Sequence, residues 1–107
     1  MAELHELAWA AGLFEGEGSI THNLTDLQVT LVNTDHEVVE RFDAIVQRGH
    51  VYGPYTSGHT DGYTRKPRWL WLSKGDATHD VLDMLAPWLS ARRRAQALEH
   101  GVILPEP

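Results

Sequence analysis

Two glycines four residues apart, Gly12 and Gly16, stand in a stretch that otherwise has the composition of a helix. Residues 3–15 are rich in Ala and Leu, lack Pro, and place their apolar side chains at helical spacing. Each glycine costs such a helix about 1 kcal/mol relative to Ala, so its presence needs a reason. Ala8, Gly12 and Gly16 share one helix face, where another backbone could approach closely. The pattern predicts a helix that packs against a second helix.

Two acidic residues, Glu15 and Glu17, come where this helix gives way to the first expected strand. Carboxylates at the C-terminal end of a helix are electrostatically unfavourable because the helix dipole is negative there. Such carboxylates are candidates for function, and a hard divalent cation is the ligand that suits them. An exposed acidic turn without a ligand is the alternative interpretation.

The chain has 107 residues and a formal charge of −6, which fits one small domain over residues 1–107. It has no cysteine, so disulfides and thiolate metal sites are excluded. The seven histidines lack the spacing of a zinc site. No apolar run is long enough to span a membrane, and no signal-peptide pattern is present. We therefore expect a protein that is not secreted and that lies in the cytoplasm, or in the interior of a host organelle or of a phage-infected cell.

The acidic residues gather in residues 1–47, whereas basic residues alternate with Tyr and Trp in residues 48–74. A mixture of basic and aromatic side chains is one footprint of nucleic-acid binding. A solvated hairpin is the alternative, and an acidic chain is a poor general DNA binder because Lys and Arg supply phosphate affinity. A nucleic-acid function therefore needs evidence that is more specific than composition and charge.

After the first helix, the patterning predicts an alternation of strand pairs and helices. The expected elements are strands over 19–23 and 27–32, a helix from a capping box at 34–37 to Gly49, strands over 50–55 and 68–73, a helix over 76–85, and a last helix from Pro87 to Gly101. The order α-β-β-α-β-β-α(α) indicates an α+β domain with helices on one face of an antiparallel sheet. Trp69 and Trp71 share one strand face, and the pattern leaves open whether this face is the buried one. Trp88 is expected in the core.

Residues 10–18, AAGLFEGEG, resemble the nine-residue motif of the LAGLIDADG homing endonucleases, with Glu in place of Asp at both acidic positions. Ser19 and Ile20 follow, as is usual in that family. Further likenesses are Asn-Thr-Asp at 33–35, the stretch 49–53, and Pro-Trp-Leu at 87–89 followed by two arginines. The likeness spans about residues 4–98.

The resemblance implies a homodimer in which the two motif helices pack side by side across a two-fold axis. The paired sheets would form a saddle over double-stranded DNA, with strands in the major groove and the acidic second helix turned away from the DNA. The target would be long and roughly palindromic, and both strands would be cut, as in intron homing. The expected dimer interface consists of Ala8, Ala11, Gly12, Glu15 and Gly16.

Glu17 matches the motif acid that binds the catalytic metal in the family, and the Gly16 carbonyl would be its companion ligand. The resemblance implies Mg²⁺, for which Mn²⁺ could substitute, activating water and stabilising the leaving 3′ oxygen. Arg92 falls where the family has a pocket lysine and would contact phosphate. Glu15 would cap and orient the helix pair, and Leu31 stands where some members carry a pocket glutamine.

The polar faces of the two hairpins supply candidate DNA contacts, through base edges or phosphates. They are Thr21, Asn23, Gln28 and Thr30 in the first hairpin, and His50, Tyr52, Arg65, Lys66 and Arg68 in the second. Each could instead be a solvated strand residue. Two further functions stay open: a DNA-binding or maturase-like RNA-splicing protein of the same fold that does not cut, and a dimerising domain without nucleic acid. Glu17 and the basic pocket would separate the enzyme from the binding protein.

Overall fold

The computed structural model describes residues 2–23, 26–56 and 66–105. Its elements are α1 Leu4–Glu17, β1 Gly18–Asn23, β2 Asp26–Asn33, α2 His36–Val46, β3 His50–Tyr55, β4 Arg68–Lys74, α3 Asp76–Leu85, a 3₁₀ turn η1 Ala86–Trp88, and α4 Ala91–Glu99. The predicted α+β class and element order are confirmed. The helices of the described chain are too short or too polar to cross a membrane.

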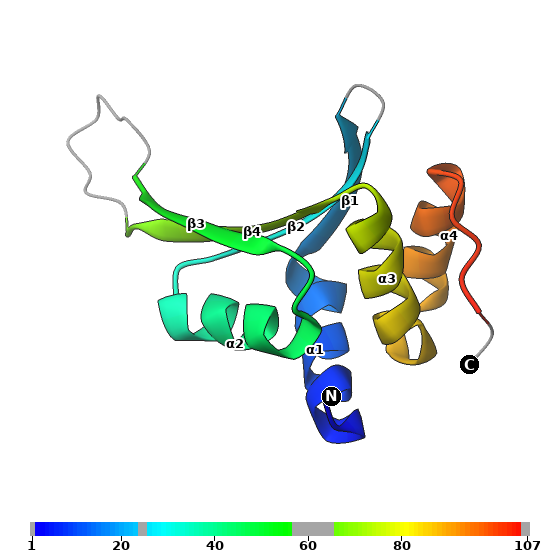
Figure 1. Ribbon diagram of the computed structural model, residues 1–107, viewed down its shortest axis with the longest axis horizontal. Coiled ribbons are helices and arrows are strands. Elements are labelled where there is room, and N and C mark those ends of the chain that lie inside the picture. The colour runs from blue at the N-terminus through cyan, green and yellow to red at the C-terminus, as the bar shows by residue number, and fades with distance from the viewer. Residues whose placement is uncertain (1, 24–25, 57–65, 106–107) are drawn as a thin grey trace.

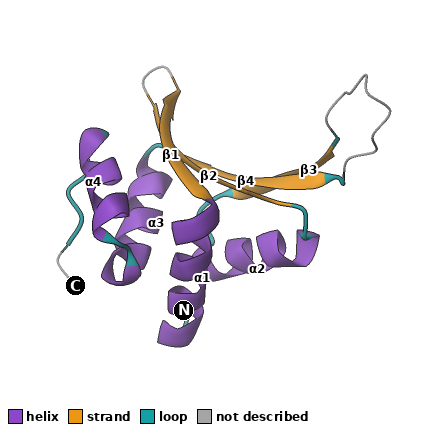
Figure 2. Cartoon of the chain, turned by 180° about the vertical axis from the view of Figure 1, so that it is seen from behind, coloured by secondary structure: helices purple, strands orange, loops and turns teal. Residues whose placement is uncertain are grey.

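The four strands form one antiparallel sheet in the order β1-β2-β4-β3. The helices lie together on one side of this sheet, with α4 outermost, and no helix of the described chain covers the other side (Figure 1). The sheet curves, so that the hairpin of β1 and β2 rises away from α1 and α2, while His22 of β1 contacts His100 at the end of α4; Figure 2 shows the same curvature from behind. The single chain therefore has a curved sheet with one open face.

Aromatic side chains fill the centre of the layer between sheet and helices. Trp71 of β4 is fully buried and stacks on Phe42 of α2 at a centroid distance of 4.7 Å, and Phe14 of α1 meets Phe42 edge-on. Trp71 Nε1 donates to Asp43 Oδ1 at 3.1 Å, which satisfies its polar atom at the edge of the core. The tryptophan face of β4 is thus the covered face, and Trp69 on that face stacks on His36.

Trp88 was expected in the core, and this prediction is wrong: its exposed fraction is 38%. Pro87 opens only the short turn η1, and α4 begins after Ser90, whose side chain accepts from Arg93 N. Ala86, the first residue of the turn, and Leu89, directly after it, take the buried positions. The tight turn therefore directs the intervening tryptophan outward.

Both ends of α2 differ in detail from the prediction. The N-terminal cap is Asp35 rather than Thr34, because the Asp35 carboxylate accepts from the backbone N–H groups of the first turn. The helix ends at Gln47, which adopts the left-handed conformation that was expected of Gly49. Gly49 has another role: a Cβ there would lie 2.5 Å from the backbone oxygen of Leu72, so glycine allows the chain to pass close to β4.

The acidic residues are separated from the open sheet face. Among the described residues, Asp26 at the start of β2 is the only acidic residue in a strand, and all others belong to helices or their N-terminal caps. Arg68 and Lys74 lie at the two ends of β4. The negative net charge of the chain therefore lies mainly on the helical layer, and the sheet carries little of it.

Candidate functional site

The motif helix α1 runs into β1 without an intervening loop. Gly18, the first strand residue, donates its N–H to the carbonyl of Phe14, and a Cβ at position 18 would lie 2.3 Å from the Phe14 ring. The abrupt change from helix to strand leaves Glu17, the last helical residue, on the surface beside the sheet. Sequence and packing together thus place the Glu17 carboxylate where α1 meets β1. We call this junction, from Gly16 to Gly18, the motif corner.

The Glu17 carboxylate is exposed and makes no hydrogen bond or ion pair with the described chain. It lines a hollow of about 270 Å³ together with Val32 and Asn33 of β2, Thr34, and Arg68 of β4. A carboxylate in such a setting has its oxygens available for an external ligand. The neighbouring Gly16 carbonyl accepts from no side chain of the described residues, so two hard oxygen donors stand close in sequence here.

Glu15, two residues earlier, has the opposite surroundings. Its carboxylate accepts from Ser90 N at 2.9 Å, from Ser90 Oγ at 2.7 Å, and from Arg92 Nη2 at 3.2 Å. Burial raises the pKa of Glu15, but the Ser90 hydrogen bonds and the charges of Arg92 and Arg93 outweigh it, and the pKa lies below its usual value. Glu15 was predicted in the interface between two copies; the structure shows it joining α1 to α4 of its own chain.

Arg93 stabilises the same junction between α1 and α4 from inside the protein. Its exposed fraction is 4%, and its guanidinium donates to the carbonyl of Glu15 at 3.0 and 3.2 Å and to that of Gly18 at 2.7 Å. These carbonyls flank the end of α1, where a cation is favoured by the helix dipole. Sequence reasoning missed this role, because the contacts join residues more than 70 positions apart and no local signal distinguishes Arg93 from the arginines on either side of it.

Arg92, the predicted phosphate contact, also lies at this end of α1. Its Nη2 donates to the Glu15 carbonyl at 3.1 Å as well as to the carboxylate, but 67% of its side chain is exposed. The contacts hold the guanidinium beside the motif corner while its outer edge stays in solvent. The structure therefore brings Arg92, Glu17 and the Gly16 carbonyl to one end of one helix.

The outer face of α1 contains both motif glycines. Gly12 and Gly16 are exposed, and a Cβ at either position would meet nothing within 4 Å. Nothing in the described part of this chain therefore requires glycine at these two positions. Ala8 on the same face is half-buried, whereas Ala11 is fully buried against the core with Phe14, so the prediction that Ala11 faces a second copy is wrong. The 100° turn per residue carries Ala11 to the inner face.

The open sheet face gathers the described residues that were predicted to contact DNA. Residues directly opposite in antiparallel strands point to the same face, and here they form cross-strand rows. The rows are Thr21, Gln28 and Lys74; Thr30, Leu72 and His50; Val32, Leu70 and Tyr52; and Arg68 with Tyr55. Lys66 lies just before β4 and is exposed. Arg65 and the side chain of Asn23 lie outside the described residues.

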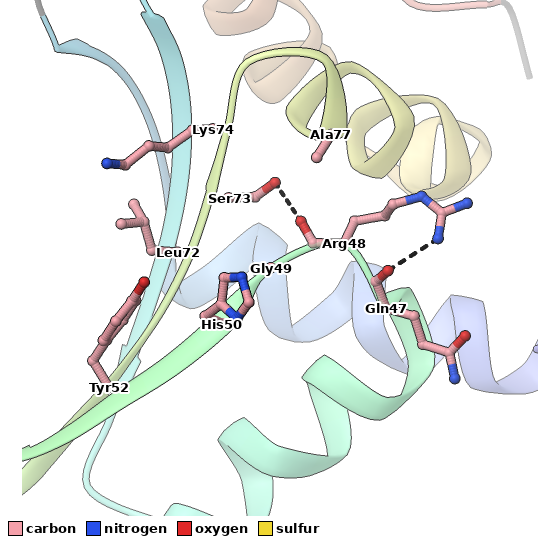
Figure 3. A pocket seen from close by; sticks show the side chains of 9 residues that line it. All are labelled: Gln47, Arg48, Gly49, His50, Tyr52, Leu72, Ser73, Lys74 and Ala77. Carbon is pink, nitrogen blue, oxygen red and sulfur yellow. Dashed lines mark hydrogen bonds between the residues drawn. The ribbon is translucent and has the colours of Figure 1, made fainter.

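A hollow of about 590 Å³ marks one rim of this face, where β3 begins beside the end of β4 (Figure 3). Tyr52, Leu72 and Lys74 project to one side of β4, while Ser73 turns to the other side and donates to the Arg48 carbonyl at 2.6 Å. Arg48 itself donates to Asp80 on α3 at 3.3 Å. At this rim Lys74 therefore projects outward, whereas Arg48 is bound to α3.

A helix that ends in two carboxylates at the edge of a curved sheet with one open face is the arrangement that the resemblance to the LAGLIDADG homing endonucleases implies. Solved structures agree. The homing endonuclease I-CvuI in complex with its target in the presence of 2 mM Ca matches with a TM-score of 0.62 at 21% identity. I-CvuI with the I-CreI target in 2 mM Mg, with the DNA not cleaved, gives 0.59 at 20%, and the archaeal intron-encoded I-Vdi141I complexed with DNA gives 0.63 at 12%.

These likenesses cover 90–91% of this chain and 65% of each matched chain, so the chain spans about two thirds of their length. No protein-family model and no curated protein matches the sequence. At these identities the comparison establishes the fold. The resemblance predicted from residues 10–18 is confirmed at that level: the chain has the fold of the LAGLIDADG homing endonucleases.

Proposed function

We propose that the protein is a site-specific, metal-dependent homing DNA endonuclease that acts as a homodimer on a long, pseudo-palindromic double-stranded target. The observation that carries this proposal is the Glu17 carboxylate, exposed and without a partner in the described chain, at the corner between the motif helix and the open sheet face. The solved structures with this fold are DNA complexes, which supports DNA as the ligand of the corresponding face here.

The homodimer is supported by the outer face of α1. Gly12 and Gly16 lower the stability of the isolated helix, yet a side chain at either position would meet open space within the chain. A second copy of α1 laid against this face gives both glycines a role, since their absent side chains let two helix backbones approach. A two-fold pairing would also bring Glu17 of each protomer to the same stretch of DNA.

A hard divalent cation fits the donor set at the motif corner. The Glu17 carboxylate and the Gly16 carbonyl are oxygen donors of the kind that Mg²⁺ takes, leaving room for water and phosphate oxygens. When bound, the cation would supply activation of water and stabilisation of the charge on the leaving 3′ oxygen. We infer Mg²⁺, with Mn²⁺ as a substitute.

Arg92 would act on the phosphate. Its exposed guanidinium, held by Glu15 at the same helix end, can offset phosphate charge but is a poor proton carrier because it stays protonated. Arg93 would position the corner from within through its bonds to the carbonyls of Glu15 and Gly18.

The open sheet face would lie in the major groove. Gln28 with Thr21 and Thr30 offers donors and acceptors for base edges, while Lys66, Arg68, Lys74 and His50 offer contacts to phosphates. The acidic helices on the other side would face away from the DNA, which reconciles a net charge of −6 with binding to a polyanion.

A DNA-binding protein or splicing factor of this fold that does not cut is the second candidate. It is favoured by Leu31, the counterpart of a pocket glutamine in some members, because Leu31 is fully buried in the core and adds no polar group at the corner. The corner therefore depends on Glu17 and Arg92 for its chemistry.

A randomised duplex library incubated with the protein in Mg²⁺ or Mn²⁺ tests the proposal. We expect selected duplexes to be cut on both strands, Glu17→Gln to abolish cutting while binding persists, and Asp83→Asn, which neutralises an exposed carboxylate on α3, to cut like the wild type. Binding without cutting in either metal would assign the second candidate. The absence of any bound duplex would overturn both.

A further inference from the structure

The open face of the sheet carries an apolar patch formed by Val32, Leu70, Leu72 and Tyr52. Val32, Leu70 and Tyr52 stand in one row across β2, β4 and β3, and Leu72 follows in the next row. Val32 and Tyr52 are 38% and 42% exposed, and none of the four side chains belongs to the core or packs against it. A solvated strand face is normally polar, so these side chains need an explanation outside the chain.

The patch lies between the motif corner and the rim of the face. Val32 lines the hollow that contains Glu17, and Leu72 and Tyr52 line the larger hollow that contains Lys74 and His50 (Figure 3). The polar row of Thr21, Gln28 and Lys74 stands farther along the hairpin of β1 and β2, which rises away from α1 (Figure 1). Along β2 the open face therefore changes from apolar beside Glu17 to polar toward the hairpin end.

The surroundings of the patch suit an anionic partner that presents apolar groups. Arg68 and Lys74 lie at the two ends of β4. Asp26, the only acidic residue in a strand of the described chain, lies at the end of β2 that is remote from Val32. A duplex fits this arrangement because its phosphates meet the cations while its major groove meets the strands. The only methyl group in the major groove of unmodified DNA is the C5-methyl of thymine, and apolar side chains contact it.

We propose that Val32, Leu70, Leu72 and Tyr52 read thymine methyl groups in the part of each half-site nearest the cleaved phosphates, while the outer part is read through hydrogen bonds by the row of Thr21 and Gln28. This inference rests on the proposed function, since it needs DNA in contact with the open face. It states which feature of the target the chain selects: a thymine-rich inner segment, on either strand, in each half-site.

Duplexes selected by binding to the protein provide the test, with deoxyuridine placed at one thymine position at a time. Deoxyuridine lacks only the methyl group, so base pairing is kept. Affinity is expected to fall about two- to fourfold for each inner thymine whose methyl is contacted, and to stay unchanged for outer thymines. Leu70→Gln and the nearly isosteric Val32→Thr should weaken this dependence, whereas Gln28→Ala, on the polar row, should keep it. Circular dichroism verifies that each variant is folded.

The outcomes separate the inference from the proposed function. Selected duplexes that bind equally with thymine or deoxyuridine throughout the inner segment would overturn thymine reading and leave the DNA-binding function intact. Failure to select any duplex would overturn both. If Leu70→Gln changes the mass in light scattering while methyl dependence at the inner segment is unchanged, the patch covers another protein chain and the inference is wrong.

Discussion

The two carboxylates at the end of α1 stand two residues apart and have opposite surroundings. Glu15 accepts three hydrogen bonds from Ser90 and Arg92, and its pKa is lowered because these contacts and the two arginine charges outweigh burial, which alone would raise it. Glu17 is exposed and has no partner in the part of the chain that the structure describes. One acid is a structural link between helices, and the other is available to a ligand.

The difference shows how a short motif divides its tasks between the two sides of one helix end. Inward, Glu15 and the buried Arg93 connect α1 to the start of α4. Outward, Gly12, Gly16 and Glu17 have unfilled surroundings. Inward residues should therefore control stability, and outward residues should control assembly and chemistry.

The largest expected effect on stability is that of Arg93→Met. Removing the guanidinium takes away the buried side-chain donor to the Gly18 carbonyl and leaves Arg92 as the only side-chain donor to the Glu15 carbonyl, at a cost of about 3 kcal/mol in the free energy of unfolding. Urea unfolding at fixed protein concentration measures it. Arg92→Met is the matched control: its side chain is largely exposed, so a loss within about 1 kcal/mol is expected. Equal losses in the two variants would remove the distinction between the inner and outer arginine.

This pair of arginines also shows where prediction from sequence ends. Leu27, Val29 and Leu31 alternate with polar residues in the sequence, and all three are buried, because the period of a strand is a local property that the sequence shows directly. A run of three arginines is ordinarily solvated, and local pattern alone does not indicate that the middle one is buried. Its burial follows from contact with α1, more than 70 residues earlier in the chain.

The same limit explains why the burial of Ala11 and the partners of Glu15 were not predicted. The motif correctly predicted a helix that contains two glycines and is followed directly by a strand. Both the spacing of the glycines and the start of the strand can be read from the local sequence. Which of its small residues faces outward depends on how the helix is rotated against the core, and that rotation is set by Phe14 packing on Phe42. The partner of Glu15 depended on the position of Ser90, where a 3₁₀ turn replaced the expected helix start.

The next largest effect tests the outer face of α1. Gly12→Leu should raise the dissociation constant of the dimer about a hundredfold or more, because two symmetry-related leucines would force the helices apart. The isolated chain should not be destabilised, since the new side chain meets open space and leucine favours helix over glycine. Light scattering over a dilution series gives the mass, and Asp83→Leu on α3 shows what an added surface leucine does elsewhere. An unchanged dimer mass would refute close pairing of the helices.

A smaller effect is expected from Glu15→Gln, and it should depend on pH. The pKa of Glu15 is lowered in the folded protein, so its ionised form contributes stability that is present above the ordinary value of 4.5 and is lost as pH falls through the folded-state pKa. The variant should lose about 1 kcal/mol at neutral pH. Below pH 4.5 the wild type should approach the variant, because both side chains are then uncharged. Urea unfolding at several pH values measures both curves, and a constant gap between them would show that the Glu15 charge has no part in the junction.

The smallest expected effect on stability is that of Glu17→Gln, although its effect on cutting should be complete. Since the carboxylate has no partner in the described chain, the free energy of unfolding should change by no more than about 0.5 kcal/mol without added metal. Added Mg²⁺ should raise the stability of the wild type by mass action and leave the variant unchanged. A stability loss as large as that of Glu15→Gln would mean that Glu17 also stabilises the fold. The distinction between Glu15 as a structural residue and Glu17 as a residue available to a ligand would then be wrong.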